Sequence, residues 1–392
     1  MRKRALWSIL LVIVALPWDI SSLVMPGLSL TKLATLVTSG LFAWGLFKGP
    51  RGSFRRNDPL FWLLLLLPLA GIISSFGTWD WKPGVIEILR IMSLWILLGA
   101  FLWHVQPEDL PSVSQVFMGV MVLTAVFGLF QYASGYFLWG EAAGSFTRRA
   151  NSTFIDPNIF ARYLIVSILF VLTEIQDRTT GRSGPVLMLL LLVLGVGVSF
   201  SRTGWADLAL ASGLFVVFSG EKRWKQLLWG TPAAVLLVIV IPAVRSRLLT
   251  LQTDITAGRD YLWTAGYWMF HDYPWRGVGI GNFQAYFENH FMYLLNGSTI
   301  TRSHTYLVTI AAEMGVLGLV LTGIAFAYII WVAVSMLRRK KSHDQPWLLA
   351  AVLGILTIFI SAQGEGRFFE DPLLWILIGY IGVYAREVRY RV

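Results

Sequence analysis

Three short segments of the sequence place arginine or histidine beside small polar residues, in a chain that is otherwise mostly apolar. They are Ser-Arg-Thr-Gly at 201–204, Gly-Arg-Asp at 258–260 and Arg-Ser-His-Thr at 302–305. The guanidinium of arginine is a rigid fork of N–H donors that binds phosphate oxygens in pairs. Histidine is the usual proton acceptor near neutral pH. These residue types therefore point to a site that binds an anion and accepts a proton.

Each segment also has an ordinary structural explanation. Arg202 could be a snorkelling arginine in a turn between two apolar segments. Arg259 could pair with Asp254 or Asp260 as a solvated loop charge. His304 could make one structural hydrogen bond at the membrane interface, and for Arg259 and His304 taken alone we favour the structural explanation. For Arg202 we favour a functional role, because an arginine at the centre of a membrane helix costs about 2.5–3.5 kcal/mol and usually faces an aqueous cavity or a partner.

Two neighbouring features would position these residues. Ser303 or Thr305 can cap a helix that begins here, which would place His304 at a helix N-terminus, where backbone N–H groups favour an anion. The glycine-rich run at 274–282 permits tight turns and close approach of the backbone to a ligand. Because no βαβ unit is plausible around it, we do not interpret this run as a dinucleotide-binding fingerprint.

Several other chemistries are argued against by the sequence. There is no cysteine, which excludes disulfides, thiol catalysis and cysteine-based metal sites. The net charge of +10 does not indicate a nucleic-acid partner, because the basic residues lie in short clusters between apolar runs. We predict no metal site, since the acidic residues and histidines expected on the active side form neither HExxH nor Asp-x-Asp. In the loop at 365–371, Glu370 and Asp371 could instead orient Arg367.

The elements that must carry these groups are membrane helices. Hydrophobic residues are 56% of the chain and charged residues only 14%, too few to cover the surface of a soluble protein, for which about 25% is usual. We predict an all-α polytopic transmembrane helical bundle, a single membrane domain over 1–392 with about twelve spans of roughly 20 residues. The predicted spans are 5–24, 30–47, 59–76, 85–103, 112–132, 157–175, 185–200, 205–219, 227–244, 315–337, 347–362 and 373–386.

The loops between these spans predict an orientation. Loops and tails on one side contain many lysines and arginines, so that side should be cytoplasmic, with both termini on it. On the opposite side nearly all basic residues are arginine, which topology alone does not require. A high ratio of arginine to lysine throughout the proteome would explain this count equally well. The loop at 245–304 lies on that outer side. It is rich in Trp, Tyr and Phe and is not of low complexity, so we expect it to fold.

The order of the polar segments resembles that of a known superfamily. An Arg/Asn/Phe/Pro-Asn segment at 149–158 is followed by Ser-Arg-Thr-Gly at 201–204 and Gly-Arg-x-x-x-Trp at 258–263. Then come Pro-x-x-Gly-x-Gly-x-Gly-Asn-Phe at 274–283, Ser-His-Thr-Tyr-Leu at 303–307 and Ala-Glu-Met-Gly-x-x-Gly at 312–318. This arrangement resembles the bacterial O-antigen ligase and Wzy-type O-antigen polymerase superfamily, over about 145–385 and most strongly over 199–320.

The resemblance implies a GT-C-like glycosyltransferase of the bacterial inner membrane with a periplasmic active site. Its donor would be a glycan on undecaprenyl pyrophosphate. The acceptor would be the lipid A core for a ligase, or a second lipid-linked glycan for a polymerase. The superfamily uses no nucleotide, metal or other cofactor. Its essential residues match Arg202, Arg259 and His304 as catalytic residues, with Arg149, Asn158, Arg162 and Arg302 as weaker candidates for substrate binding.

Residue chemistry and resemblance lead to one hypothesis. Two arginines would stabilise the departing pyrophosphate as a preorganised electrostatic site. His304 would accept the proton of the attacking hydroxyl, and a single displacement would invert the anomeric configuration. We favour a ligase because one long outer loop dominates, and this choice rests on analogy. A polymerase remains the alternative, and a transporter of lipid-linked glycans is the alternative from another class.

Overall fold

The structured part of the chain is helical. The computed structural model describes residues 2–18, 29–48, 59–76, 78, 80–138, 149–176, 183–219, 260–291, 303–339 and 346–390, and these residues contain no β-strand. The prediction of an all-helical fold is confirmed for this part of the chain. Apolar runs in a lipid environment form helices because a helix satisfies every backbone N–H and C=O within its own segment.

Most of the predicted spans correspond to a helix. These helices are α1 (Arg2–Ala15), α3 (Leu30–Lys48), α4 (Pro59–Ser74), α5 (Trp81–His104), α6 (Leu110–Ser134), α7 (Pro157–Gln176), α8 (Ser183–Val198), α9 (Arg202–Phe218), α14 (Tyr306–Arg339), α15 (Pro346–Glu365) and α16 (Pro372–Tyr390). The predicted span at 227–244 lies outside the described residues.

Length and composition support a polytopic membrane protein. Within the described ranges, 5 helices are long and apolar enough to cross a membrane: α5, α7, α14, α15 and α6 together with the short helix that precedes it. The helices α1, α3, α4, α8 and α16 contain shorter apolar segments. The chain is therefore a helical membrane protein with several spans, while the count of about twelve stays a prediction.

Helix α7 forms the centre of the bundle. All of its residues from Ile159 to Glu174 are buried, and it packs against α6, α8, α9 and α15. Its start is well defined, because Pro157 takes the first helical position and the carboxylate of Asp156 accepts the backbone N–H of Asn158 at 2.6 Å. A helix that is buried on all sides fixes the positions of the helices around it.

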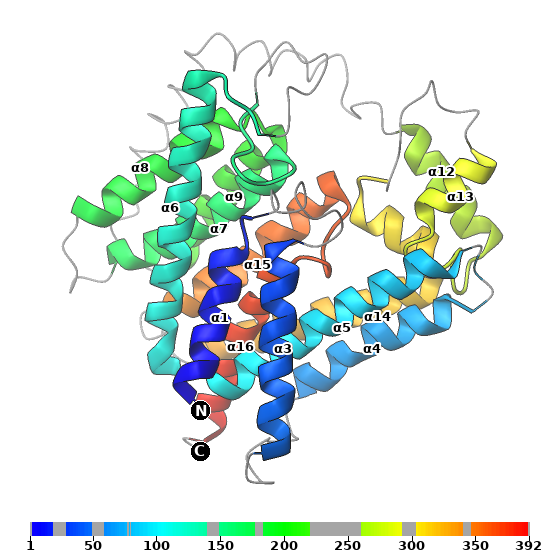
Figure 1. Ribbon diagram of the computed structural model, residues 1–392, viewed down its shortest axis with the longest axis horizontal. Helices are drawn as coiled ribbons and strands as arrows, with labels where there is room; N and C mark the ends of the chain where they lie inside the picture. The colour runs from blue at the N-terminus through cyan, green and yellow to red at the C-terminus, as the bar shows by residue number, and fades with distance from the viewer. Residues whose placement is uncertain are drawn as a thin grey trace.

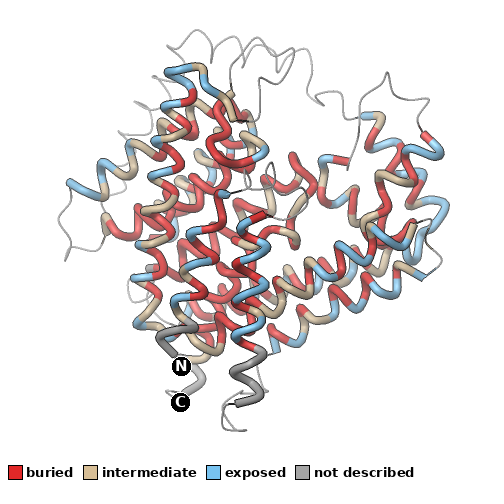
Figure 2. Tube along the Cα trace, in the orientation of Figure 1, coloured by how far each residue is buried: buried red, intermediate tan, exposed pale blue. Residues whose placement is uncertain are grey.

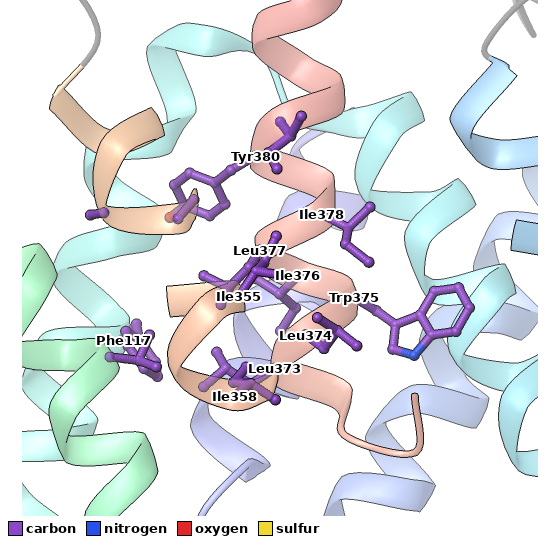
Figure 3. Packing of buried hydrophobic residues seen from close by; sticks show 14 of the residues in the cluster. Phe117, Ile355, Ile358, Leu373, Leu374, Trp375, Ile376, Leu377, Ile378 and Tyr380 are labelled. Atoms are coloured by element: carbon purple, nitrogen blue, oxygen red, sulfur yellow. The ribbon is translucent and has the colours of Figure 1, made fainter. Parts of the chain in front are cut away.

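The other main core element is α16, which packs against α5 and α15. Figure 3 shows its apolar side chains from Leu373 to Tyr380 beside Ile355 and Ile358 of α15. Tyr380 is buried, and its hydroxyl lies 2.9 Å from that of Ser114 on α6. Figure 2 shows buried residues concentrated in the middle of the bundle, with exposed residues on the peripheral helices.

The two ends of the bundle differ. Both termini lie at one end, at the bottom of Figure 1. At the other end, here called the loop end, α7, α9, α14 and α16 begin and α15 finishes. The described parts of the functional segments predicted from the sequence therefore lie at the loop end.

The predicted loop at 245–304 is folded in its described part. It contains α12 (Asp260–Asp272) and α13 (Phe283–His290), which share a small core of their own that includes Leu262, Met269 and Phe287. In Figure 1 these helices stand beside α4, α5 and α14, away from α8 and α9. Residues 245–259 and 292–302 lie outside the described residues.

Candidate active site

The first turn of α7 joins two of the polar segments. The Arg149 side chain donates from Nε to the Ser199 carbonyl at 3.2 Å and from Nη2 to Oδ1 of Asn158 at 3.0 Å. The same Asn158 oxygen accepts the Ser201 hydroxyl at 2.7 Å. The prediction grouped Arg149 and Asn158 as substrate-binding candidates, and the structure places them together. Their bonds to each other and to 199–201 indicate that they hold the Ser-Arg-Thr-Gly turn in place.

Arg202 is the first residue of α9. Ser201 caps this helix, since its hydroxyl accepts the N–H of Gly204 at 3.0 Å. Gly204 brings the helix against α7, because a Cβ there would lie 2.8 Å from that of Ala161. Arg202 is partly exposed and forms no ion pair with any residue that the structure describes. A cation at a helix N-terminus is opposed by the macrodipole, so guanidinium and helix end together favour a bound anion.

His304 lies at the start of α14, as the capping pattern predicted. Its backbone is left-handed, with φ 55°, and the residue is exposed. The buried Ser303 fixes this turn: its hydroxyl donates to the Thr305 carbonyl at 2.7 Å and accepts the Thr305 N–H at 3.1 Å. The indole N–H of Trp263 on α12 donates to the Thr305 hydroxyl at 2.8 Å. Helix α12 therefore approaches the residue next to His304.

Arg162 is held in a buried ion-pair network. Its side chain is 2% exposed and lies 3.1 Å from Glu365 and 2.7 Å from Asp371. The Tyr163 hydroxyl donates to the second oxygen of Asp371 at 2.8 Å. These ion pairs fix the position of the Arg162 side chain, and its predicted contact with substrate stays a prediction. The network also shows that Asp371 is engaged by Arg162, whereas the sequence suggested that it could orient Arg367.

The segment that Arg162 anchors reaches His304. Gly366 follows Glu365 directly, and its ideal Cβ position lies 3.4–3.6 Å from backbone atoms of His304. Gly366 has φ +81°, a conformation that residues with side chains rarely adopt. Helix α7 is thus linked to the Arg202 turn through Asn158 and to the His304 turn through Arg162.

Backbone strain is concentrated in the same segments. Among the described residues, the non-glycine residues with positive φ are Ser152, Phe200 and His304, at 54°, 48° and 55°. One lies in each of the 149–158, 199–204 and 303–307 segments. Such conformations cost about 1–3 kcal/mol each and cluster at active sites and ligand clamps. Sequence reasoning missed this signal because none of the three residues is a glycine.

The glycine-rich run makes its close approaches to α14. Val278 and Gly279 donate their N–H groups to the carbonyls of Ala312 and Glu313, each at 2.9 Å. A Cβ on Gly277 would lie 2.3 Å from the Glu313 carbonyl carbon. We expected these glycines to permit approach to a ligand, and the structure shows them packed against a helix backbone. Residues 274–283 and 312–317 together are here called the clasp.

A carboxylate holds the other end of the clasp. Glu313 is buried, and its two oxygens accept the N–H groups of Gly281 at 2.9 Å and Phe283 at 3.1 Å. On the α4–α5 side, Ile280 donates its N–H to the Ser74 hydroxyl at 3.2 Å. The clasp therefore attaches α12 and α13 to both α14 and the α4–α5 hairpin. Sequence reasoning identified Ala-Glu-Met-Gly and the glycine-rich run separately and missed that they pair.

Two predicted residues, Arg259 and Arg302, lie outside the described residues. The structure thus brings together Arg149, Asn158 and the Arg202 turn at one point, and Arg162 and the His304 turn at another. Both points belong to the loop end and share α7. The predicted roles of all seven residues remain predictions.

Comparison with known proteins supports the resemblance found in the sequence. A family model described as O-antigen ligase matches residues 187–323, a range that includes Arg202, Arg259, Arg302 and His304. The chain is also 24% identical to the teichuronic acid biosynthesis protein TuaE of Bacillus subtilis (strain 168) over 365 residues, 82% of this chain and 73% of the relative. The resemblance to the O-antigen ligase and Wzy superfamily is confirmed.

Proposed function

We propose that this protein is a glycosyltransferase that moves a glycan from undecaprenyl pyrophosphate to an acceptor hydroxyl. One observation carries the proposal. Arg202 at the start of α9 and His304 at the start of α14 are each held by a separate hydrogen-bonded turn, and both turns are connected to α7. Transfer from a pyrophosphate donor requires a group that binds the leaving anion and a group that accepts a proton, both held in fixed positions.

The reaction is a single displacement. The acceptor oxygen attacks the anomeric carbon, and the bond between that carbon and the pyrophosphate oxygen breaks. His304 takes the proton of the acceptor hydroxyl as the new glycosidic bond forms. Arg202 stabilises the charge that develops on the leaving pyrophosphate. The product has the opposite anomeric configuration, and the reaction needs no metal because the arginine donors supply the positive charge.

Arg259 is the second arginine of this proposal. Helix α12 begins at the next residue, and Trp263 of α12 contacts Thr305 beside His304. Arg302 adds positive charge from the other end of the loop. Arg149 and Asn158 hold the Arg202 turn, and Arg162 holds the segment behind His304.

We infer the orientation of the protein in the membrane from the distribution of its basic residues. The termini face the cytoplasm of a bacterial inner membrane, and the loop end faces the periplasm. A lipid-linked glycan displayed on the periplasmic leaflet would then present its pyrophosphate at the level of Arg202. The overall architecture would be GT-C-like, with α12 beside the His304 turn.

A ligase that uses the lipid A core as acceptor is our first candidate. A polymerase is retained because the relative TuaE is named for teichuronic acid and not for O-antigen. Purified protein in liposomes, supplied with lipid-linked glycan and lipid A core, decides between them on a glycan gel. Glycan joined to the core supports a ligase, and a ladder on the lipid carrier supports a polymerase. Movement of the lipid-linked glycan across the bilayer without a new glycosidic bond would overturn the proposal in favour of a transporter.

A further inference from the structure

A second polar region at the loop end is not used by the proposed reaction. It is a cavity of about 240 Å³ between α1, α3, α5 and α7 and the segment 367–372 that leads into α16. Its charged lining residues are Lys32, Arg90, Arg162, Arg367, Glu370 and Asp371. The cavity reaches the surface, because Lys32 is exposed and the lining residue Ile155 is 49% exposed.

The charge facing the cavity is positive. Four lining side chains are cationic and two are anionic. Glu87 pairs with Arg90 and Glu365 pairs with Arg162, but neither carboxylate lines the cavity. They balance the charge of the whole cluster, so the positive excess belongs only to the side chains that face the cavity. The start of α3 adds to the effect, because Ser29 and Thr31 also line the cavity and helix N-termini favour anions.

The cavity is distinct from the centre at Arg202 and His304. Of the predicted site residues that the structure describes, only Arg162 lines it. On the His304 side the 365–371 segment lies between the two regions, because a Cβ on Gly366 would lie 3.4–3.6 Å from the backbone of His304 while Arg367 and Asp371 line the cavity. Neither Arg202 nor His304 lines the cavity.

We propose that this cavity binds the phosphoryl group of the lipid that carries the acceptor glycan. The assignment to an acceptor rests on the proposed glycosyl transfer, in which the donor pyrophosphate takes the Arg202 centre. The volume is below the roughly 300–1,000 Å³ of sites for drug-sized ligands, so it suits a phosphate group and not an oligosaccharide. The apolar lining residues Leu16, Leu94 and Ile159 suit the first carbons of a lipid chain. The acceptor's sugars would then extend around the 365–371 segment towards His304.

Binding stoichiometry tests this proposal. Native mass spectrometry of the full-length protein in detergent with farnesyl pyrophosphate should show two bound equivalents in the wild type. The Lys32→Gln/Arg367→Gln variant and the Arg202→Ala variant should each bind one, and Lys32→Gln alone should weaken the cavity equivalent. Lys82→Gln is the matched control, because Lys82 is exposed at the start of another helix and does not line the cavity, and it should bind two. The proposal would be overturned if the Lys32→Gln/Arg367→Gln variant still bound two equivalents. It would also be overturned if the wild type bound only one equivalent and only the Arg202→Ala variant lost it.

Competition identifies the source of the phosphoryl group. Lipid A core should displace the cavity equivalent if the protein is a ligase, and undecaprenyl pyrophosphate should displace it if the protein is a polymerase. Displacement by phosphatidylglycerol alone would overturn the assignment to an acceptor. In kinetic assays, Lys32→Gln/Arg367→Gln should raise the KM for the acceptor roughly tenfold and leave the KM for the donor unchanged. Wild-type transfer measured on the same preparation tests the proposed function separately.

Discussion

The clasp and the three strained turns are both built from short segments rich in small residues, but they use them differently. In the clasp, left-handed conformations fall on glycines, and backbone groups of 274–283 bond to α14 or to the Glu313 carboxylate. In the turns, left-handed conformations fall on Ser152, Phe200 and His304. The clasp therefore fixes α12 and α13 with little strain, whereas the turns hold strained residues beside partly or fully exposed polar groups. From this difference we propose that the clasp serves assembly and that the turns serve chemistry.

The largest effect that this comparison predicts concerns His304. His304→Ala should lower the initial rate of glycosyl transfer about 10²–10⁴-fold, because the acceptor hydroxyl loses its proton acceptor. The thermal unfolding temperature should change little, since the exposed side chain contributes little to packing. His271→Ala serves as the control, because this histidine is 60% exposed on α12 and should transfer normally. A normal rate for His304→Ala would remove His304 from the mechanism.

The second largest loss of transfer rate should follow from substitution of Arg202. Arg202→Ala should reduce transfer about 10²–10³-fold, the usual cost of losing one preorganised donor to a charged group in the transition state. Arg202→Lys keeps the charge without the fork of donors and should recover only a small part of the rate. Arg338→Ala, an exposed arginine at the other end of α14, is the control and should have no effect. Full activity of Arg202→Lys would show that charge alone suffices.

In the clasp, substitutions should act on stability. A Cβ at Gly279 would lie 2.0 Å from the Thr78 side chain, and its φ of +104° is strained for other residues. Gly279→Ala should therefore destabilise the attachment of α12 and α13 by about 1–3 kcal/mol, seen as a lower unfolding temperature. Gly119→Ala on α6, where nothing lies within 4 Å, should leave it unchanged. Equal unfolding temperatures for the two variants would contradict the packing role of the clasp.

The smallest effect should follow from Glu313→Gln. The amide keeps the shape of the side chain but retains only one oxygen for the N–H groups of Gly281 and Phe283. The loss of one hydrogen bond should cost about 0.5–1.5 kcal/mol of stability, and transfer per folded molecule should be unchanged. Measuring the rate against the folded fraction separates the two quantities. A loss of rate without a loss of folded protein would place Glu313 with the turns and not with the clasp.

Most of the fold could be predicted from the sequence, because apolar runs of sufficient length determine where membrane helices lie. The first part of α14 was harder to predict. The helix begins at Tyr306 and is interrupted at Gly315, which has φ 60° and ψ −152°, so the predicted span at 315–337 corresponds to the part that follows the interruption. The turns before Gly315 pack against α12 and bond to the clasp, and the hydropathy-based span does not include them.

The site was predicted only as a set of residue types. The pairing of Arg162 with Glu365 and Asp371 joins residues about 200 positions apart, and nothing in the local sequence indicates it. The left-handed backbone at Phe200 and Ser152 is imposed by tertiary contacts, so propensity does not reveal it. The glycine-rich run was visible, but its partner at 312–315 became clear only when the two segments were seen in contact.

The central claim is that the turns at Arg202 and His304 form the transfer site. The most direct test is the initial rate of glycosyl transfer from an undecaprenyl-pyrophosphate-linked glycan by purified Arg202→Ala/His304→Ala protein, normalised to its folded fraction. We predict a rate indistinguishable from that of protein-free liposomes, with the unfolding temperature of the wild type retained. A rate close to that of the wild type would contradict the account.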